Sequence, residues 1–394
     1  MSSTSSSAAP LPASFTERTS AMRLVMRAGA VDDLRAELEL LGIARPLVLS
    51  GQRMRASRLF GQAMEAMRGM SVELAQPVPA HSSVMLVEQL VTQARAANID
   101  GLIAIGGGSA SDSAKAVALL LAEGGRLADH AVRFTPPDKL VVPPLRASKL
   151  PIVAIPGTAS GAEVTVSLGV RDADGAKLLF SDPRLSATLV LLDPRANLEV
   201  PAALMCSTGM NGLAHCIEGL YSRDRSPVAE ILALDAIARF ADALPSVRRR
   251  PDDEGARAAL LYAAHLSGRV LVHARTCLHH AVCHAIGSIT GVGHGNANSV
   301  LLPHAVAFNA EAAPTAMARA AAALGAAADA SALPGALRRL QVDAGVPTRL
   351  RDIGVPREAL ARIAAKTMRE RGLYFNPRPV TDVAEVHALL DAAF

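Results

Sequence analysis

Four histidines and one asparagine have the types and spacing of a metal site built on helices. Asn211 and His215 are four residues apart, as are His280 and His284, and residues at this spacing share one face of a helix. His294 follows ten residues after His284. One acid with three histidines is a common ligand set for a catalytic divalent metal. The position expected for the acid holds Asn211, which carries no charge.

A glycine-rich turn separates an apolar segment, residues 101–105, from a helical segment, residues 109–123. Glycines let the backbone approach a phosphate closely, and a helix N-terminus adds free N–H groups and a positive dipole end. An ordinary tight turn is the alternative. Ser109 is a candidate N-cap residue, with Asp112 three positions on. The segment predicts phosphate or pyrophosphate binding by these residues: Gly106, Gly107, Gly108 and Ser109.

A second polar loop, residues 156–165, follows the apolar segment 151–155 and contains Thr158 and Ser160. Small and hydroxylated residues at the carboxyl end of a strand suit the ligand crevice of an open parallel sheet. A plain Gly/Ser-rich connection is the alternative interpretation.

These candidate residues need a scaffold, and its first half alternates strand-like and helix-like segments. Such alternation predicts a Rossmann-like parallel sheet with helices on both faces. From about residue 201, Ala- and Leu-rich helical segments follow one another without a convincing strand. The predicted strands are 46–50, 101–105, 151–155 and 188–192, and the predicted helices are 84–97, 109–123, 227–244, 252–272, 315–328 and 357–366.

The change of character near residue 198 divides the chain into three predicted parts. Residues 1–18 form a disordered tail, since they are rich in Ser and Ala and lack the apolar core of a signal peptide. Residues 19–198 form a dinucleotide-binding α/β domain, and residues 199–394 form an all-helical catalytic domain.

Composition excludes several classes of function. Half of the 394 residues are hydrophobic, the formal net charge is +4, and only 3% are aromatic, so nucleic-acid binding is not expected. No run of eighteen apolar residues exists, so no membrane span is expected. The four cysteines form no CxxC pair and indicate reduced thiols and a cytoplasmic location.

Taken together, the motifs resemble those of the iron-containing alcohol dehydrogenase superfamily. They run in family order over most of the chain. The matching stretches are GGGSASDSAK (106–115), IPGTASGAEVT (155–165), STGMNGLAHCIEGLYS (207–222), LHHAVCHAIG (278–287) and GHGNANSVLLPHAVAFN (293–309). The resemblance implies a dehydroquinate synthase-like architecture, with an α/β N-terminal domain and an all-α C-terminal domain.

Within that superfamily the chain is most similar to the maleylacetate reductases. They also carry Asn where other members have Asp, as Asn211 does, and their helix has a doubled histidine like His279–His280. The length of loop 156–165 and the tail YFNPRP (374–379) match as well. Two features depart from that pattern: HGNAN (294–298) resembles the alcohol dehydrogenases, and Gly157 replaces a threonine.

The resemblance implies a nicotinamide dinucleotide, NADH or NADPH, in a cleft between the domains. The glycine turn would hold its pyrophosphate. At the position where NAD-preferring relatives carry an Asp, this chain has Gly51, followed by Arg53 and Arg55. We expect NADPH to be accepted, because an Arg can pair with its 2′-phosphate. Four further residues match family positions near the cofactor: Asp112, Thr158, Ser160 and Lys177. For Lys177 the alternative interpretation is a solvated surface lysine.

The resemblance also implies roles for the histidines, and the absence of a carboxylate at position 211 bears on those roles. His215, His280 and His294 match metal ligands, and His284 matches a histidine near the nicotinamide. With Asn211, a bound Fe²⁺ or Zn²⁺ would have four neutral ligands in a buried cleft, which is costly. We therefore favour a metal-free site, in which one of the four histidines stabilises the alkoxide and supplies its proton.

The predicted function is NAD(P)H-dependent reduction of a carbonyl, on maleylacetate or a related oxo acid. Arg378 and His279 are the candidates for meeting a substrate carboxylate. Three alternatives remain: a metal-dependent alcohol dehydrogenase acting on simple alcohols or aldehydes, a dehydroquinate synthase-like lyase, and a nucleotide-binding protein without enzymatic activity. Relatives imply a homodimer or a larger homo-oligomer.

Overall fold

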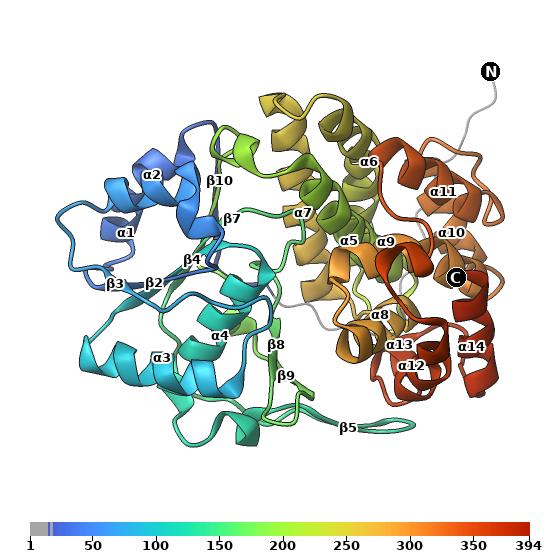
Figure 1. Cartoon of the computed structure of the whole chain (residues 1–394), viewed down its shortest axis with the longest axis horizontal. Helices are drawn as coiled ribbons and strands as arrows, with labels where there is room; N and C mark the ends of the chain where they lie inside the picture. Colours follow the sequence, from blue (N-terminus) through green and yellow to red (C-terminus); the bar gives the residue numbers. More distant parts are fainter. Residues whose placement is uncertain (1–14, 16–18) are drawn as a thin grey trace.

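A six-stranded parallel sheet forms the N-terminal half of the molecule (Figure 1). The computed structural model describes residue 15 and residues 19–394, so the predicted tail lies almost entirely outside the described residues. The strand order is β1-β10-β7-β4-β2-β3. The strands are β1 (Arg23–Met26), β2 (Pro46–Ser50), β3 (Glu73–Leu74), β4 (Gly101–Gly106), β7 (Ile152–Pro156) and β10 (Leu189–Leu192). The four predicted strands are confirmed, and β1 and β3 extend the sheet at its edges.

Side chains of the central strands alternate between two apolar layers, as a pleated strand requires. Leu102 and Ala104 of β4 pack with helices α3 (Val84–Ala96) and α4 (Gly108–Glu123). Ile103 and Ile105 pack on the other face, with α1 (Leu34–Leu40) and α2 (Arg58–Ala66). Helices therefore cover both faces, and the predicted Rossmann-like arrangement is confirmed.

Two antiparallel hairpins lie beside the main sheet and were not predicted. They are β5 (Arg133–Thr135) with β6 (Lys139–Val141), and β8 (Ser167–Arg171) with β9 (Lys177–Ser181). The β5–β6 hairpin projects from the lower part of the molecule in Figure 1. Lys177, one of the residues predicted to lie near the cofactor, opens the second strand of the β8–β9 hairpin.

Helices make up the C-terminal half, as predicted, with one isolated β-bridge between Arg225 and Ala274. The predicted helix 315–328 is too long, because the chain turns at Gly325, whose φ is +74°. The helices are α5 (Ala202–Tyr221), α6 (Pro227–Arg249), α7 (Glu254–His273), α8 (Leu278–Thr290), α9 (His294–Asn309), α10 (Pro314–Ala323), α11 (Ala332–Ala344), α12 (Leu360–Thr367), α13 (Gly372–Phe375) and α14 (Val383–Ala392).

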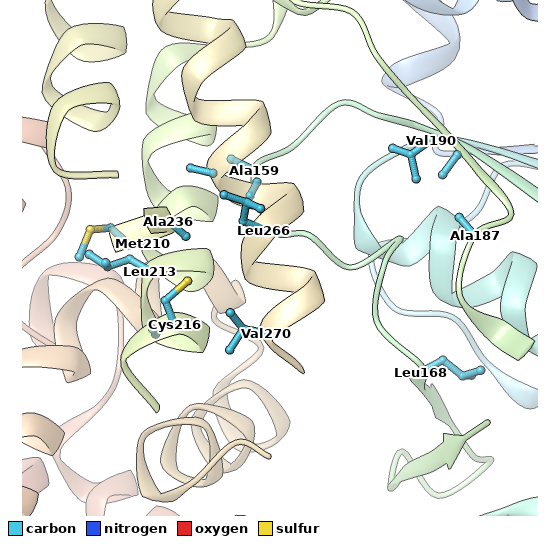
Figure 2. Close-up of a cluster of buried hydrophobic side chains, with 14 of the residues drawn as sticks. Ala159, Leu168, Ala187, Val190, Met210, Leu213, Cys216, Ala236, Leu266 and Val270 are labelled. Carbon is cyan, nitrogen blue, oxygen red and sulfur yellow. The ribbon is translucent and has the colours of Figure 1, made fainter. Parts of the chain in front are cut away.

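Helix α5 lies at the centre of this half and packs on α6 and α7. Figure 2 shows Met210 and Leu213 of α5 in the same apolar cluster as Leu266 of α7. A Cβ atom on Gly212 would lie 2.7 Å from the Phe240 ring and 3.0 Å from Ser267 Oγ, so only glycine allows this approach. Among the residues that the structure describes, no helix is both long and apolar enough to span a bilayer.

Candidate active site

The glycine turn, residues 106–109 (the nucleotide loop), lies where β4 ends and α4 begins. Gly106 has φ +132°, and Gly107, rather than the predicted Ser109, is the N-cap residue of α4. Ser109 lies within the helix and donates to the carbonyl of Ala80. A Cβ atom on Gly107 would lie 3.2 Å from Thr158 Cγ2. The backbone here is open to a phosphate because side chains are absent.

Residues 156–165 (the threonine loop) follow β7 and lie beside the nucleotide loop. The parallel register pairs Gly106 with Pro156, so the two strand ends are adjacent. The structure therefore brings together the two loops that the sequence singled out. Asp112 lies on α4 and accepts a hydrogen bond from the backbone N–H of Gly169, 3.2 Å away, so it also anchors the β8–β9 hairpin.

Lys115 holds the threonine loop in place, a role that sequence reasoning missed. It is fully buried on α4, and its Nζ donates to Ala162 O at 2.6 Å, Thr165 O at 2.7 Å and Thr165 Oγ1 at 3.0 Å. Burial lowers the pKa of Lys115 to about 8. A lysine on the apolar face of helix 109–123 was the available signal, since such a residue needs oxygen partners.

Lys177 extends from β9 across Gly169 toward the C-terminal half. A Cβ atom on Gly169 would lie 2.2 Å from Lys177 Cε. The positive charge of Lys177 contributes to lowering the pKa of His280, His284 and His294, after burial as the largest cause in each case. Lys177 is solvent-exposed, yet protein atoms surround its ammonium group closely enough to lower its own pKa. Lys177 therefore lies close enough to these histidines to act on them electrostatically.

The four predicted histidines come together from three helices, and we refer to them as the histidine cluster. His215 on α5 stacks on His280 of α8, with ring centroids 4.7 Å apart. His284 lies 6.2 Å from His280 and 5.6 Å from His294, the first residue of α9. The i, i+4 spacing thus placed His280 and His284 on one face, as expected.

Glu218 is the carboxylate of this site, although the sequence analysis assigned it no role. It is fully buried on α5, and its Oε2 lies 2.6 Å from His280 Nδ1. Burial raises the pKa of Glu218 to about 7 and lowers that of His280, so both shifts favour a neutral acid–imidazole pair. His280 Nε2 lies 3.3 Å from Asn211 Oδ1. The sequence signal that could have identified Glu218 is its position three residues after His215, which places both side chains on the same face of α5.

The donor atoms do not converge on a metal in the predicted way. Within residues 19–394, the only group with three His, Cys, Asp or Glu donors mutually within 4.8 Å is Glu218, His279 and His280. Two of those donors are already engaged, since His279 Nε2 lies 3.0 Å from Asn298 O and His280 Nδ1 pairs with Glu218. The Nδ1 atoms of His215 and His294 are buried without a hydrogen-bond partner. As arranged, His215, His280 and His294 do not bring three donor atoms within 4.8 Å of one another.

The two residues predicted to meet substrate carboxylates both have partners within the protein. Arg378 pairs with Glu385 at 2.7 Å and stacks on the Phe308 ring, at 3.9 Å from its centroid. His279 is fully buried behind His280 and is held by Asn298 O. The described contacts therefore give both residues structural partners.

Two charged residues near the C-terminus, Glu370 and Arg371, lie close to the histidine cluster. Glu370 Oε2 lies 3.6 Å from His284 Nδ1. Arg371, the N-cap residue of α13, is close enough to contribute to lowering the pKa of His284, and no described residue forms an ion pair or a side-chain hydrogen bond with it. Sequence reasoning missed Arg371 because it precedes the recognised tail motif.

The predicted 2′-phosphate arginines differ in their surroundings. Arg55 donates to the carbonyl of Ala75 and is partly buried, whereas Arg53 is exposed and has no hydrogen bond or ion pair with the described residues. Arg53 is therefore the freer of the two to meet a phosphate.

We expect Arg53→Gln to raise the KM for NADPH by about tenfold, the size of one charged hydrogen bond, and to leave the KM for NADH within about twofold. Steady-state kinetics with both cofactors measure this. An equal change for both cofactors, or an NADH preference above about a hundredfold in the unaltered enzyme, would contradict 2′-phosphate recognition here.

Comparison with known proteins gives consistent matches across the chain. The family described as iron-containing alcohol dehydrogenase matches residues 21–194, and the C-terminal region of the Fe-containing alcohol dehydrogenase family matches residues 205–394. Maleylacetate reductase of Sphingobium indicum is 33% identical over 93% of this chain and 94% of its own length. Maleylacetate reductase 2 of Cupriavidus pinatubonensis is 37% identical over 77% of each chain.

A solved structure agrees with these matches. The crystal structure of maleylacetate reductase from Agrobacterium tumefaciens is 30% identical, has a TM-score of 0.81, and is aligned over 97% of this chain and 98% of that chain. The similarity includes both the parallel sheet and the helical half.

Proposed function

This chain belongs to the iron-containing alcohol dehydrogenase family and is an oxidoreductase, and from that premise we propose that it reduces maleylacetate or a closely related oxo acid with NAD(P)H. One observation carries the choice of substrate class. Two cationic side chains, Lys177 and Arg371, lie close to the histidine cluster, and neither has an ion-pair partner among the described residues. A dicarboxylate with a ketone would meet both.

The cofactor would lie along the carboxyl ends of β4 and β7. The nucleotide loop and Thr158 form a cradle in which a Cβ atom on Gly107 or Gly108 would approach the threonine loop within 3.2 to 3.3 Å. This geometry suits a pyrophosphate at the N-terminus of α4. When bound, the nicotinamide supplies the hydride.

The histidine cluster would manage charge and protons on the substrate oxygen. Hydride addition to a carbonyl, or to a double bond conjugated with it, places negative charge on that oxygen. We assign His280 Nε2 as the group that donates a hydrogen bond and then a proton to it, because Glu218 fixes the other ring nitrogen at 2.6 Å. Asn211, at 3.3 Å from His280 Nε2, would hold the ring until the substrate arrives.

This mechanism routes no step through a metal ion. The grounds are the neutral ligands at positions 211, 215, 280 and 294, and donor atoms that do not converge. Extensive dialysis against a chelator should leave kcat unchanged within about twofold, and added Fe²⁺ or Zn²⁺ should not raise it. Activity that is lost on chelation and returns only with one of these ions would instead support the metal-dependent alcohol dehydrogenase.

The deciding experiment compares substrates. NADPH oxidation followed at 340 nm should be far faster with maleylacetate than with a panel of neutral aldehydes and ketones of similar length. Preference for the neutral aldehydes, together with alcohol oxidation by NAD(P)⁺, would favour the alcohol dehydrogenase. That second function has one structural argument, because Glu218, His279 and His280 bring three donors within 4.8 Å.

If Arg371 binds a substrate carboxylate, Arg371→Gln will raise the KM for maleylacetate by about tenfold to a hundredfold, since a charged hydrogen bond is lost. The KM for a neutral aldehyde should stay within about twofold. Arg378→Gln is the matched control and should leave both KM values near those of the unaltered enzyme, because Arg378 pairs with Glu385. Equal effects of the two substitutions would contradict the assignment.

A further inference from the structure

We propose that a cavity between helix α7 and strand β1 binds a small oxyanion, either a carboxylate or a phosphate group. The cavity has a volume of about 190 Å³. Its walls come from residues 19–24, from Val164 of the threonine loop and from α7. None of its described lining residues belongs to the nucleotide loop or the histidine cluster, so the site is distinct from the candidate active site.

His265 lines this cavity with a ring that is held in a fixed orientation. The side chain is 1% exposed, and its Nδ1 is buried without a hydrogen-bond partner. The ring stacks on Tyr262, with an interplanar angle of 9° and centroids 6.3 Å apart, which holds its orientation.

Arg269 adds a positive charge on the same face of the helix, four residues after His265. Its guanidinium is half-buried, lines the cavity and forms no ion pair or hydrogen bond with any described residue. It lies close enough to His265 to contribute, after burial, to lowering the pKa of that ring. No aspartate or glutamate is among the described lining residues, so an anion that enters the cavity meets no described carboxylate beside Arg269.

The remaining walls define the size and character of that ligand. Thr19 and Ser20 offer hydroxyl groups, whereas Met22, Leu24 and Val164 are apolar. The volume is roughly ten times what one water molecule requires, so a small acid or phosphate can enter. Arg is well suited to such a ligand because its guanidinium pairs with two oxygens at once.

The cavity also adjoins the threonine loop, so its occupant could act on the candidate active site. Val164 lines it, and Gly161 of the same loop presses on α7, where an added Cβ atom would lie 2.3 Å from Ala264 O. We expect the oxyanion to change the KM for the cofactor through this loop without competing for the nucleotide loop.

Isothermal calorimetry on the full chain tests the site, with inorganic phosphate and acetate titrated separately at constant ionic strength. At least one of the two should bind to the unaltered protein, and Arg269→Gln should weaken that binding by at least about tenfold, with Arg269→Lys intermediate. Arg126→Gln is the matched control, because Arg126 is exposed and already paired with Asp129. The probe that depends on Arg269 identifies phosphate or carboxylate as the ligand class.

Two outcomes overturn the proposal. The first is that neither anion binds to the unaltered protein. The second is that Arg269→Gln binds both anions as tightly as the unaltered protein does, which would place the anion elsewhere, such as at the nucleotide loop. Equal melting temperatures of the two arginine variants without added anion establish that a loss of binding is local. His265→Asn is a second test, since it should also weaken binding of the anion whose affinity depends on Arg269.

Discussion

Replacing Glu218 with glutamine should lower kcat for carbonyl reduction by about a hundredfold to ten-thousandfold, with little change in the KM for the cofactor. Glutamine is nearly isosteric but cannot pass a proton to His280 Nδ1, which lies 2.6 Å from the carboxylate. Glutamine can still donate a hydrogen bond to Nδ1 and keep the proton on Nε2, so what is lost is the resupply of the proton that Nε2 gives to the substrate, and general acid catalysis is worth this much. Stopped-flow oxidation of NADPH with maleylacetate measures the effect directly.

The pH profile separates this role from a structural one. The pKa of Glu218 is raised to about 7, so below that pH the pair with His280 carries the proton that lets Nε2 act as a donor. As pH rises through about 7, that proton leaves, and the rate of reduction should fall by about tenfold per pH unit. The Glu218→Gln enzyme should lack this decline.

A matched control distinguishes proton transfer from the loss of any buried acid. Glu37→Gln removes another buried carboxylate, which lies on α1 and pairs with Arg23, away from the histidine cluster. Its kcat and pH profile should match those of the unaltered enzyme. If the Glu218→Gln enzyme keeps more than about a tenth of kcat, with an unchanged profile, then His280 does not rely on Glu218.

Sequence patterns predicted the scaffold and the histidine cluster because both depend on local periodicity. Apolar runs such as 101–105 identify strands buried on both faces, and the i, i+4 spacing of His280 and His284 identifies one helix face. The position of the nucleotide loop could also be predicted, because its glycines lie between a predicted strand and a predicted helix. The exception was Ser109, because α4 begins one residue before it.

The residues that sequence reasoning missed depend on contacts between distant segments. Glu218 and His280 are 62 positions apart, and only the packing of α5 on α8 makes the carboxylate a partner of the imidazole. The sequence does not show which of Arg371 and Arg378 is free to bind a substrate carboxylate, since Arg371 directly precedes the tail motif 374–379 and Arg378 belongs to it. Their difference is the presence of Glu385, which neutralises Arg378 alone.

The second large effect is expected at Lys115, which links α4 to the threonine loop. Lys115→Met keeps the length of the side chain but leaves the carbonyl of Thr165 without its buried donor, and the carbonyl of Ala162 with Thr165 Oγ1 alone. An unpaired buried carbonyl costs about 1–3 kcal/mol, so the melting temperature of a chain this long should fall by roughly 1–4 °C. The KM for NADPH should rise by at least about tenfold, because the threonine loop no longer lies against the nucleotide loop.

A second buried lysine provides the control for this prediction. Lys149 is 1% exposed in its side chain and pairs with Glu123 at 2.5 Å, at the far end of α4 from the nucleotide loop. Lys149→Met should also lower the melting temperature, since it leaves a carboxylate without its partner. It should leave the KM for NADPH unchanged, whereas Lys115→Met raises it. Equal KM values in the two variants would mean that Lys115 stabilises the fold without positioning the threonine loop for the cofactor that we propose it contacts.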